Sequence, residues 1–262
     1  MIDFETLVRE ISINGKEARE YLLNFFTKDN FAIYDIPKDA NKDEIKAIKT
    51  MFTSKKNLLD RVEASLKYDP LCIEAFFTYF VLSEDVYVNY RFEIYHNESS
   101  NFADFTEYQK RSYLRILRFY IEFLVDLHNI SNAIKVQRTI IRLSGKADRD
   151  MIDNLAYMYY LIEDEKEFYR LYTSEEFDVY AYLLLMVTLI KKDDKFKAKQ
   201  VLLDMFENIE YSEYLDHLWD LDKNDEKQME FYRKVESAYE ELASVPDFFT
   251  WVNIIHEGKE EL

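Results

Sequence analysis

The residues best suited to binding chemistry are three arginines, Arg111, Arg115 and Arg118, in the segment 105–127. Their guanidinium groups are planar, permanently charged and matched in shape to carboxylates and phosphates. The spacing of four and then three residues places all three on one face of a helix, and Glu122 and Asp126 continue the same stripe. Because the rest of this helix is largely apolar, we expect it to be packed on several sides, so that the charged stripe faces water, a partner or a groove.

Two interpretations of the arginine stripe are open at this level. In the first, the arginines bind the carboxylates of a ligand in a groove. In the second, Arg118 pairs with Glu122 on its own helix and the other arginines neutralise acidic helices, an arrangement worth under about 1 kcal/mol per pair. A further basic stripe on the segment 130–143 is expected to be a solvated face; it consists of Lys135, Arg138 and Arg142.

The sequence lacks the residue constellations that catalysis requires. The four histidines are widely separated and none belongs to a His-Glu-x-x-His motif; they are His96, His128, His217 and His256. His217 and Asp220 could share a helix face, but a surface pair is the favoured interpretation. The three glycines are isolated, so the sequence has no Gly-rich phosphate loop. We therefore predict a protein that is not an enzyme and that binds no cofactor and no metal.

The composition indicates an all-α protein. Only 3 Gly and 3 Pro occur in 262 residues, whereas 48% of the residues are hydrophobic and 16% aromatic, a balance that disfavours hairpin turns and favours packed helices. The single cysteine, Cys72, excludes an internal disulfide and fits a reducing compartment, so we expect a cytoplasmic protein. The most apolar run, 179–190, is too short to span a bilayer and is expected to be a buried core helix.

The charge distribution argues against nucleic acid or membrane as the main partner. The formal net charge is −17, whereas phosphate binding relies on clustered Lys and Arg. The segment 107–149 is a basic island, with nine Lys/Arg against four Asp/Glu and hence a net charge of +5. The segment 204–262 is the most acidic part, with five basic and seventeen acidic residues and a net charge of −12.

Periodicity and turn residues predict a chain made of helices. We predict an N-terminal helical region, 1–100, with an extended connector at 28–40, and a repeat region, 101–262, unless the two form one continuous solenoid. A polar linker at 96–101 would separate them. Helices are expected at 3–11, 16–26, 41–53, 55–67, 71–95, 105–127, 130–143, 151–162, 165–172, 179–191, 195–207, 212–221, 225–243 and 248–257.

The junction at 64–76, ASLKYDPLCIEAF, resembles the boundary between tetratricopeptide (TPR) repeats. In that family a helix ends in Ala-Leu-x-x-Asp-Pro and the next begins with Ala and an aromatic residue; here Ser65 and Phe80 replace usual small residues. Ala133, Phe168 and Ala198 occupy similar places in successive helix pairs, at intervals of 35 and 30 residues. The resemblance implies a TPR-like antiparallel helix-pair solenoid with irregular repeats; a plain helical bundle is the alternative.

The same resemblance implies where a ligand would bind. Aligned with TPR proteins, Arg115 and Arg118 line the concave groove, with Arg111 one turn earlier, and the following repeats direct Asn154, Tyr157 and Tyr180 into it. TPR domains that hold a peptide's terminal carboxylate use Lys, Arg and Asn side chains of this kind. We therefore predict a scaffold that binds an acidic or C-terminal segment of a protein or peptide. The alternative is a ligand- or peptide-responsive regulator of helical-repeat type without its own DNA-binding domain.

The last predicted helix, 248–257, has almost no polar face. Asp247 is expected to cap its N-terminus. A helix of this composition must be covered, because an exposed apolar solenoid end is unstable in water. We expect it to dock on the last repeat as a capping C-terminal helix, with a homodimer formed through this helix as the alternative.

Overall fold

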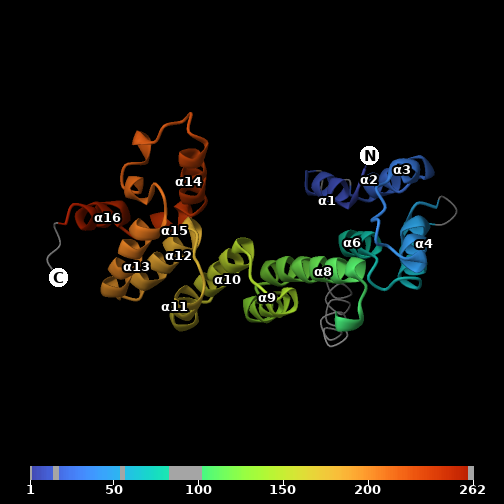
Figure 1. Cartoon of the computed structure of the whole chain (residues 1–262), viewed down its shortest axis with the longest axis horizontal. Helices are drawn as coiled ribbons and strands as arrows, with labels where there is room; N and C mark the ends of the chain where they lie inside the picture. The colour runs from blue at the N-terminus through green and yellow to red at the C-terminus, as the bar shows by residue number, and fades with distance from the viewer. Residues whose placement is uncertain (1, 14–17, 54–56, 83–101, 259–262) are drawn as a thin grey trace. The chain divides into compact units, whose positions relative to one another are not determined.

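The computed structural model describes residues 2–13, 18–53, 57–82 and 102–258, and in these residues the protein is all-α. The only β-type pairing among them is an isolated parallel bridge between Ile2 and Tyr34. The described chain divides into two compact units, residues 1–128 (unit 1) and 129–262 (unit 2). Figure 1 shows the whole chain coloured by residue number, from blue at the N-terminus to red at the C-terminus. None of its described helices is both long and apolar enough to span a bilayer.

The helices of unit 1 pack around α6. In chain order they are α1 (Phe4–Ile13), α2 (Ala18–Phe25), α3 (Lys28–Ile33), α4 (Lys42–Met51), α5 (Leu58–Leu66), α6 (Ile73–Leu82) and α8 (Glu107–Asp126). Helix α6 contacts α2, α4, α5 and α8, and its first six residues are all buried. The strongly apolar sequence that follows Pro70 therefore forms the centre of this unit.

Local sequence signals explain where the helices of unit 1 begin. Asn41 and Glu44 form a complete capping box at the start of α4, as their spacing predicts. Thr106 and Gln109 form a second capping box at the start of α8. The predicted extended connector at 28–40 is wrong in its first half, because 28–33 form α3. The Thr27 side chain caps this short helix, and the Asn30 amide donates to the Phe25 carbonyl at 2.8 Å.

Helix α8 confirms the pattern predicted for the arginine stripe. Nine of its side chains are buried, namely Tyr108, Ser112, Tyr113, Ile116, Leu117, Tyr120, Ile121, Phe123 and Leu124. Arg111, Arg118, Glu122 and Asp126 are exposed and Arg115 is half-buried. A helix covered round most of its circumference thus presents one charged stripe, and the stripe begins beside the N-terminal residues of unit 1.

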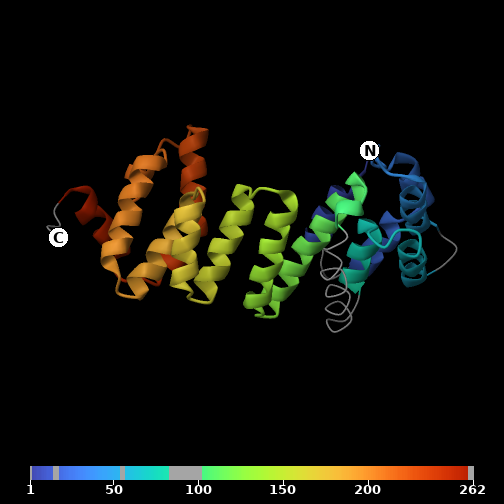
Figure 2. The ribbon, with the colours of Figure 1, turned by 60° about the horizontal axis from the view of Figure 1, so that its bottom comes forward.

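Unit 2 is built around α12, which confirms the predicted core helix. Its elements are α9 (Ile130–Ser144), α10 (Arg149–Leu161), α11 (Glu165–Ser174), α12 (Val179–Lys191), α13 (Lys195–Asn208), two short 3₁₀ helices (Ser212–Tyr214 and Leu218–Asp220), α14 (Glu226–Ser237), α15 (Tyr239–Ala243) and α16 (Phe248–His256). Helix α12 contacts α10, α11, α13, α14 and α15. Figure 2 shows helices α9 to α13 following one another in an up-and-down row.

Two predictions about local structure differ from what the chain forms. The segment 212–221 forms two 3₁₀ turns instead of one helix. Asp247 precedes α16 with a left-handed backbone, φ 57°, and its side chain makes no capping hydrogen bond. The chain divides into its two compact units after His128, and the linker predicted at 96–101 lies outside the described residues. The two helices predicted as one central hairpin therefore belong to different units.

Candidate functional site

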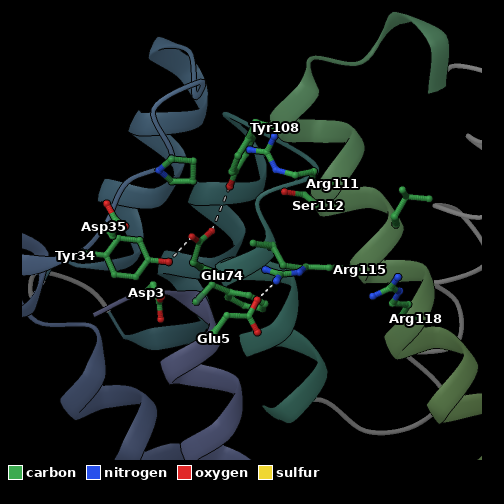
Figure 3. A pocket seen from close by; sticks show the side chains of 14 residues that line it. Asp3, Glu5, Tyr34, Asp35, Glu74, Tyr108, Arg111, Ser112, Arg115 and Arg118 are labelled. Atoms are coloured by element: carbon green, nitrogen blue, oxygen red, sulfur yellow. Dashed lines mark hydrogen bonds and ion pairs between the residues drawn. The ribbon is translucent and has the colours of Figure 1, made fainter. Parts of the chain in front are cut away.

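The three arginines of the stripe line a pocket in unit 1 with a volume of about 390 Å³. Helix α8 forms one wall, and the other walls come from residues at the N-terminus, from the segment after α3 and from the start of α6. The remaining lining residues are Asp3, Phe4, Glu5, Tyr34, Asp35, Pro37, Ile73, Glu74, Tyr108, Ser112 and Leu114. Figure 3 shows the arginines and Tyr108 on the α8 side, with Tyr34 and the acidic groups on the other side of the pocket.

Two of the arginines already contact carboxylates. The Arg111 guanidinium donates to Asp39 at 2.8 Å, and Arg115 forms an ion pair with Glu5. The hydrogen bond from Arg111 lowers the pKa of Asp39. All four side chains are substantially exposed. Exposed ion pairs of this kind contribute at most about 1 kcal/mol, so a ligand carboxylate can displace them at small cost.

Arg115 and Arg118 form a pair of neighbouring cations. They lie one turn apart on α8, and burial followed by the charge of Arg118 lowers the pKa of Arg115. Burial is the larger cause of this lowered pKa, and repulsion from the Arg118 charge adds to it. An anion placed between the two guanidinium groups would relieve this repulsion and accept several charge-assisted hydrogen bonds.

A buried carboxyl group lies opposite the arginines. Glu74 on α6 is only 1% exposed, yet it is part of the pocket lining. The Tyr34 hydroxyl donates to its Oε1 at 2.6 Å, the Cys72 thiol donates to its Oε2 at 3.3 Å, and the Tyr108 hydroxyl lies 3.5 Å from Oε2. Burial raises the pKa of Glu74. The pocket therefore has a basic wall and a desolvated acidic floor.

The other predicted site residues lie in unit 2. Asn154 on α10 is exposed, and Tyr157 on α10 and Tyr180 on α12 are half-buried. Tyr157 and Tyr180 are neighbours, since the pKa of Tyr180 is raised by burial and then by Glu241 and Tyr157. The structure thus brings two of these three residues together. That they share a groove with the arginines of unit 1 stays a prediction.

The second basic stripe contains one residue with a clear structural role. Arg138 donates to Glu167 at 2.6 Å and to the Tyr159 hydroxyl at 2.5 Å, and so links α9 to α10 and α11. Lys135 and Arg142 are exposed, as expected for a solvated face. No residue of this stripe lines the pocket of unit 1.

Two groups of residues were missed by the sequence analysis. Glu74, Tyr34 and Tyr108 are far apart in the sequence, and the only local signal was an acidic residue inside the apolar run 71–77. The rings of His217 and His256 stack with centroids 6.2 Å apart, and Asp216 lies 2.5 Å from the Nδ1 of His217. His217 thus pairs with Asp216, its neighbour in the sequence. No group of three His, Cys, Asp or Glu residues in the described part of the chain could hold a metal ion.

Comparison with known proteins finds no family model, no curated protein and no solved structure that matches the chain. The function is therefore inferred from the pocket itself.

Proposed function

We propose that this protein is a non-enzymatic, cytoplasmic helical-repeat scaffold that binds a segment of another protein or a peptide. The bound segment is either acidic or presents its C-terminal carboxylate. The observation that carries the proposal is the pocket of about 390 Å³ lined by Arg111, Arg115 and Arg118. Its volume lies within the range of sites that bury small ligands or the end of a chain. The ion pairs with Asp39 and Glu5 show that Arg111 and Arg115 are oriented to bind carboxylates, although pairing within the chain is also what the second interpretation of the stripe predicts.

The TPR-like arrangement is part of this proposal, and it is supported by three helix junctions with the same backbone conformation. At each junction one residue has a positive φ, namely His128 (56°), Glu163 (54°) and Asp193 (63°). The next residue is the N-cap of the following helix, with φ/ψ of −93°/55° at Asn129, −84°/75° at Asp164 and −93°/63° at Asp194. A recurring turn of this kind is what a degenerate repeat would retain.

The small and apolar residues aligned in the sequence also occupy equivalent positions. Ala133, Phe168 and Ala198 are each the fourth residue of their helix, and each is fully buried at 0% exposure. In unit 2, α10 packs against α11, and α12 packs against α13 and α10. Helix pairs that stack on their neighbours in this way are typical of solenoids.

The proposal is tested with an array of random hexapeptides anchored at their N-termini, each displayed once with a free C-terminal carboxylate and once as the amide. We expect a subset of the free-acid peptides to bind, with at least tenfold weaker binding of the matching amides. The double variant Arg115→Gln/Arg118→Gln should lose at least tenfold in affinity, because each hydrogen bond to a charged group contributes about 1.5–3 kcal/mol.

The matched control is the double variant Lys135→Gln/Arg142→Gln, which removes the same charge from exposed positions on α9. It should bind as the unmodified protein does, and far-UV circular dichroism should show that both variants keep their helical content. Equal binding of acid and amide peptides, absence of any binding, or an equal loss in the control variant would overturn the proposal.

A further inference from the structure

The pocket of unit 1 is bipolar, which restricts the ligands that it can hold. Four acidic residues line it, namely Asp3, Glu5, Asp35 and Glu74, against three arginines. A ligand that carries only negative charge would add to this acidic excess. A ligand with one anionic and one cationic group, by contrast, leaves the charge balance unchanged and can satisfy both walls.

Glu74 is the group most in need of a cation. In the described part of the chain its side chain contacts only neutral donors, the hydroxyls of Tyr34 and Tyr108 and the thiol of Cys72. A buried carboxylate without a cationic partner is costly, since desolvation disfavours its charged form. Of the four acids that line the pocket, Glu74 alone is fully buried, so a cation placed here gains the most from low solvent screening.

The hydrogen bonds of Glu74 favour an ammonium over a guanidinium. Oε1 accepts from Tyr34, and Oε2 faces both Cys72 and Tyr108. A guanidinium binds a carboxylate best through two parallel hydrogen bonds, which need both oxygens to be accessible. An ammonium is a compact point charge and needs only one remaining acceptor position.

We propose that the pocket binds the C-terminal lysine of a peptide, with its terminal carboxylate on Arg115 and Arg118 and its side-chain ammonium at Glu74. The inference rests on the proposed function and specifies its ligand. The apolar stem of the lysine would lie against Phe4, Ile73 and Leu114, which line the same pocket. A lysine side chain commonly buries its stem while its charged end seeks a polar partner. Figure 3 shows the Arg115 guanidinium extending from α8 toward the side of the pocket that holds Glu74, with Arg118 farther along the same helix.

The test uses fluorescein-labelled hexapeptides of the form Gly-Ser-Gly-Ser-Ala-X, with binding measured by fluorescence anisotropy. X is lysine, arginine or norleucine with a free carboxylate, or lysine amide. We expect the lysine acid to bind at least tenfold more tightly than the norleucine acid, which has a stem of similar shape but no charge. The arginine acid should be intermediate, and the lysine amide should lose at least tenfold because it lacks the carboxylate.

The substitution Glu74→Gln tests whether the lysine ammonium binds at Glu74. Glu74→Gln keeps an acceptor for Tyr34 and removes the charge, so the lysine acid should fall to the affinity of the norleucine acid. Asp150→Asn, which removes an exposed carboxylate of α10, should change none of these affinities. The peptide comparison on the unmodified protein decides the question even if the Glu74 variant does not fold.

The outcomes separate the two proposals. If acid peptides bind better than amides but lysine and norleucine bind equally, the lysine inference is overturned and the carboxylate site stands. If the arginine acid binds more tightly than the lysine acid, the preference for an ammonium is overturned. If no acid peptide binds in this panel or in the array, the proposed function fails and the inference fails with it.

Discussion

Replacement of Asp153 by asparagine should stabilise unit 2. Asp153 lies on α10, and its Oδ1 is buried without a hydrogen-bond partner in the described part of the chain. Asp178 at the start of α12 is nearby, and Lys234 on α14 pairs with Asp178 at 2.7 Å instead of with Asp153. Burial, and then the charge of Asp178, raise the pKa of Asp153 from 3.8 to about 6.

The size of the effect follows from this pKa. One pKa unit corresponds to about 1.4 kcal/mol, so the difference between 3.8 and about 6 sets an upper limit of about 3 kcal/mol on the cost of ionising Asp153 in the folded protein. Because the side chain is only half-buried, solvent screening reduces this cost to about 1–2 kcal/mol. Asparagine has nearly the same shape and no charge, so Asp153→Asn should recover this free energy at neutral pH.

The raised pKa of Asp153 determines how the stability gained by Asp153→Asn should change with pH. The folded protein holds the Asp153 proton to a higher pH than the unfolded chain does, so the wild-type protein loses stability as the pH rises from about 4 through about 6. The variant lacks this loss. Its advantage in the free energy of unfolding should therefore be close to zero below pH 4 and reach about 1–2 kcal/mol at pH 7.5.

The assay is urea unfolding followed by tryptophan fluorescence. Both tryptophans, at positions 219 and 251, belong to unit 2, so the signal reports the unit that contains Asp153. The matched control is Asp150→Asn, an exposed neighbour in the first turn of α10. It should change stability by under about 0.5 kcal/mol, and towards lower stability, because Asp150 interacts favourably with the helix dipole. A variant Asp153→Asn that is no more stable at pH 7.5, or whose gain persists below pH 4, would refute the reasoning.

Two further predictions concern a helix end and the rim of the pocket. Gly145 ends α9 with φ 79°, and a Cβ added there would meet no atom within 4 Å. Gly145→Ala should therefore cost about 1 kcal/mol of stability from backbone strain alone. Urea unfolding followed by tryptophan fluorescence should show a lower midpoint, and an unchanged midpoint would contradict a cost from backbone strain. Glu5→Gln removes the exposed carboxylate that competes with a ligand for Arg115. Binding of the lysine-acid peptide should become about two- to fivefold tighter, since such an ion pair is worth up to about 1 kcal/mol. Weaker binding would show that Glu5 helps to hold the ligand.

The features that the sequence predicts well are local ones. Helix α12 was expected because its apolar residues leave no polar face, and ten of its residues are buried. The capping box of α4 follows from Asn41 and Glu44 being three residues apart. The left-handed end of α9 follows from Gly145, since glycine alone adopts this conformation without strain. In each case one or two turns of chain contain the whole physical cause.

The features that it does not predict either lack a periodic pattern or depend on distant segments. Helix α3 has no apolar period and depends on the side chains of Thr27 and Asn30. The arginine stripe was visible, but its acidic neighbours were not, since Arg111 and Asp39 are 72 residues apart. The floor of the pocket unites Tyr34, Glu74 and Tyr108 from three separate segments. A single sequence has no pattern that reports such convergence.

The buried charged side chains are divided unevenly between the two units. Among the described residues, the buried side chains with acidic or basic groups are Glu44, Arg61, Asp69, Glu74 and Asp178. Four of these five belong to unit 1, and only Asp178 belongs to unit 2. Arg61 has an evident structural purpose, because its guanidinium donates to the carbonyls of Phe26 and Met51, both at 2.9 Å, where two helices end.

Within the described residues, the buried acids of unit 1 accept hydrogen bonds from neutral donors. Glu44 completes a capping box and accepts from Thr106 at 2.7 Å, and Asp69 accepts from Gln109 at 3.1 Å, so both fix the start of α8. The raised pKa of Asp69, caused by burial, shows that these bonds do not fully offset desolvation. Glu74 lies beside them, and only it reaches the pocket. Buried acids that cost stability persist where they position or bind something; here two position the helix that carries the arginines, and the third faces the ligand that those arginines would hold.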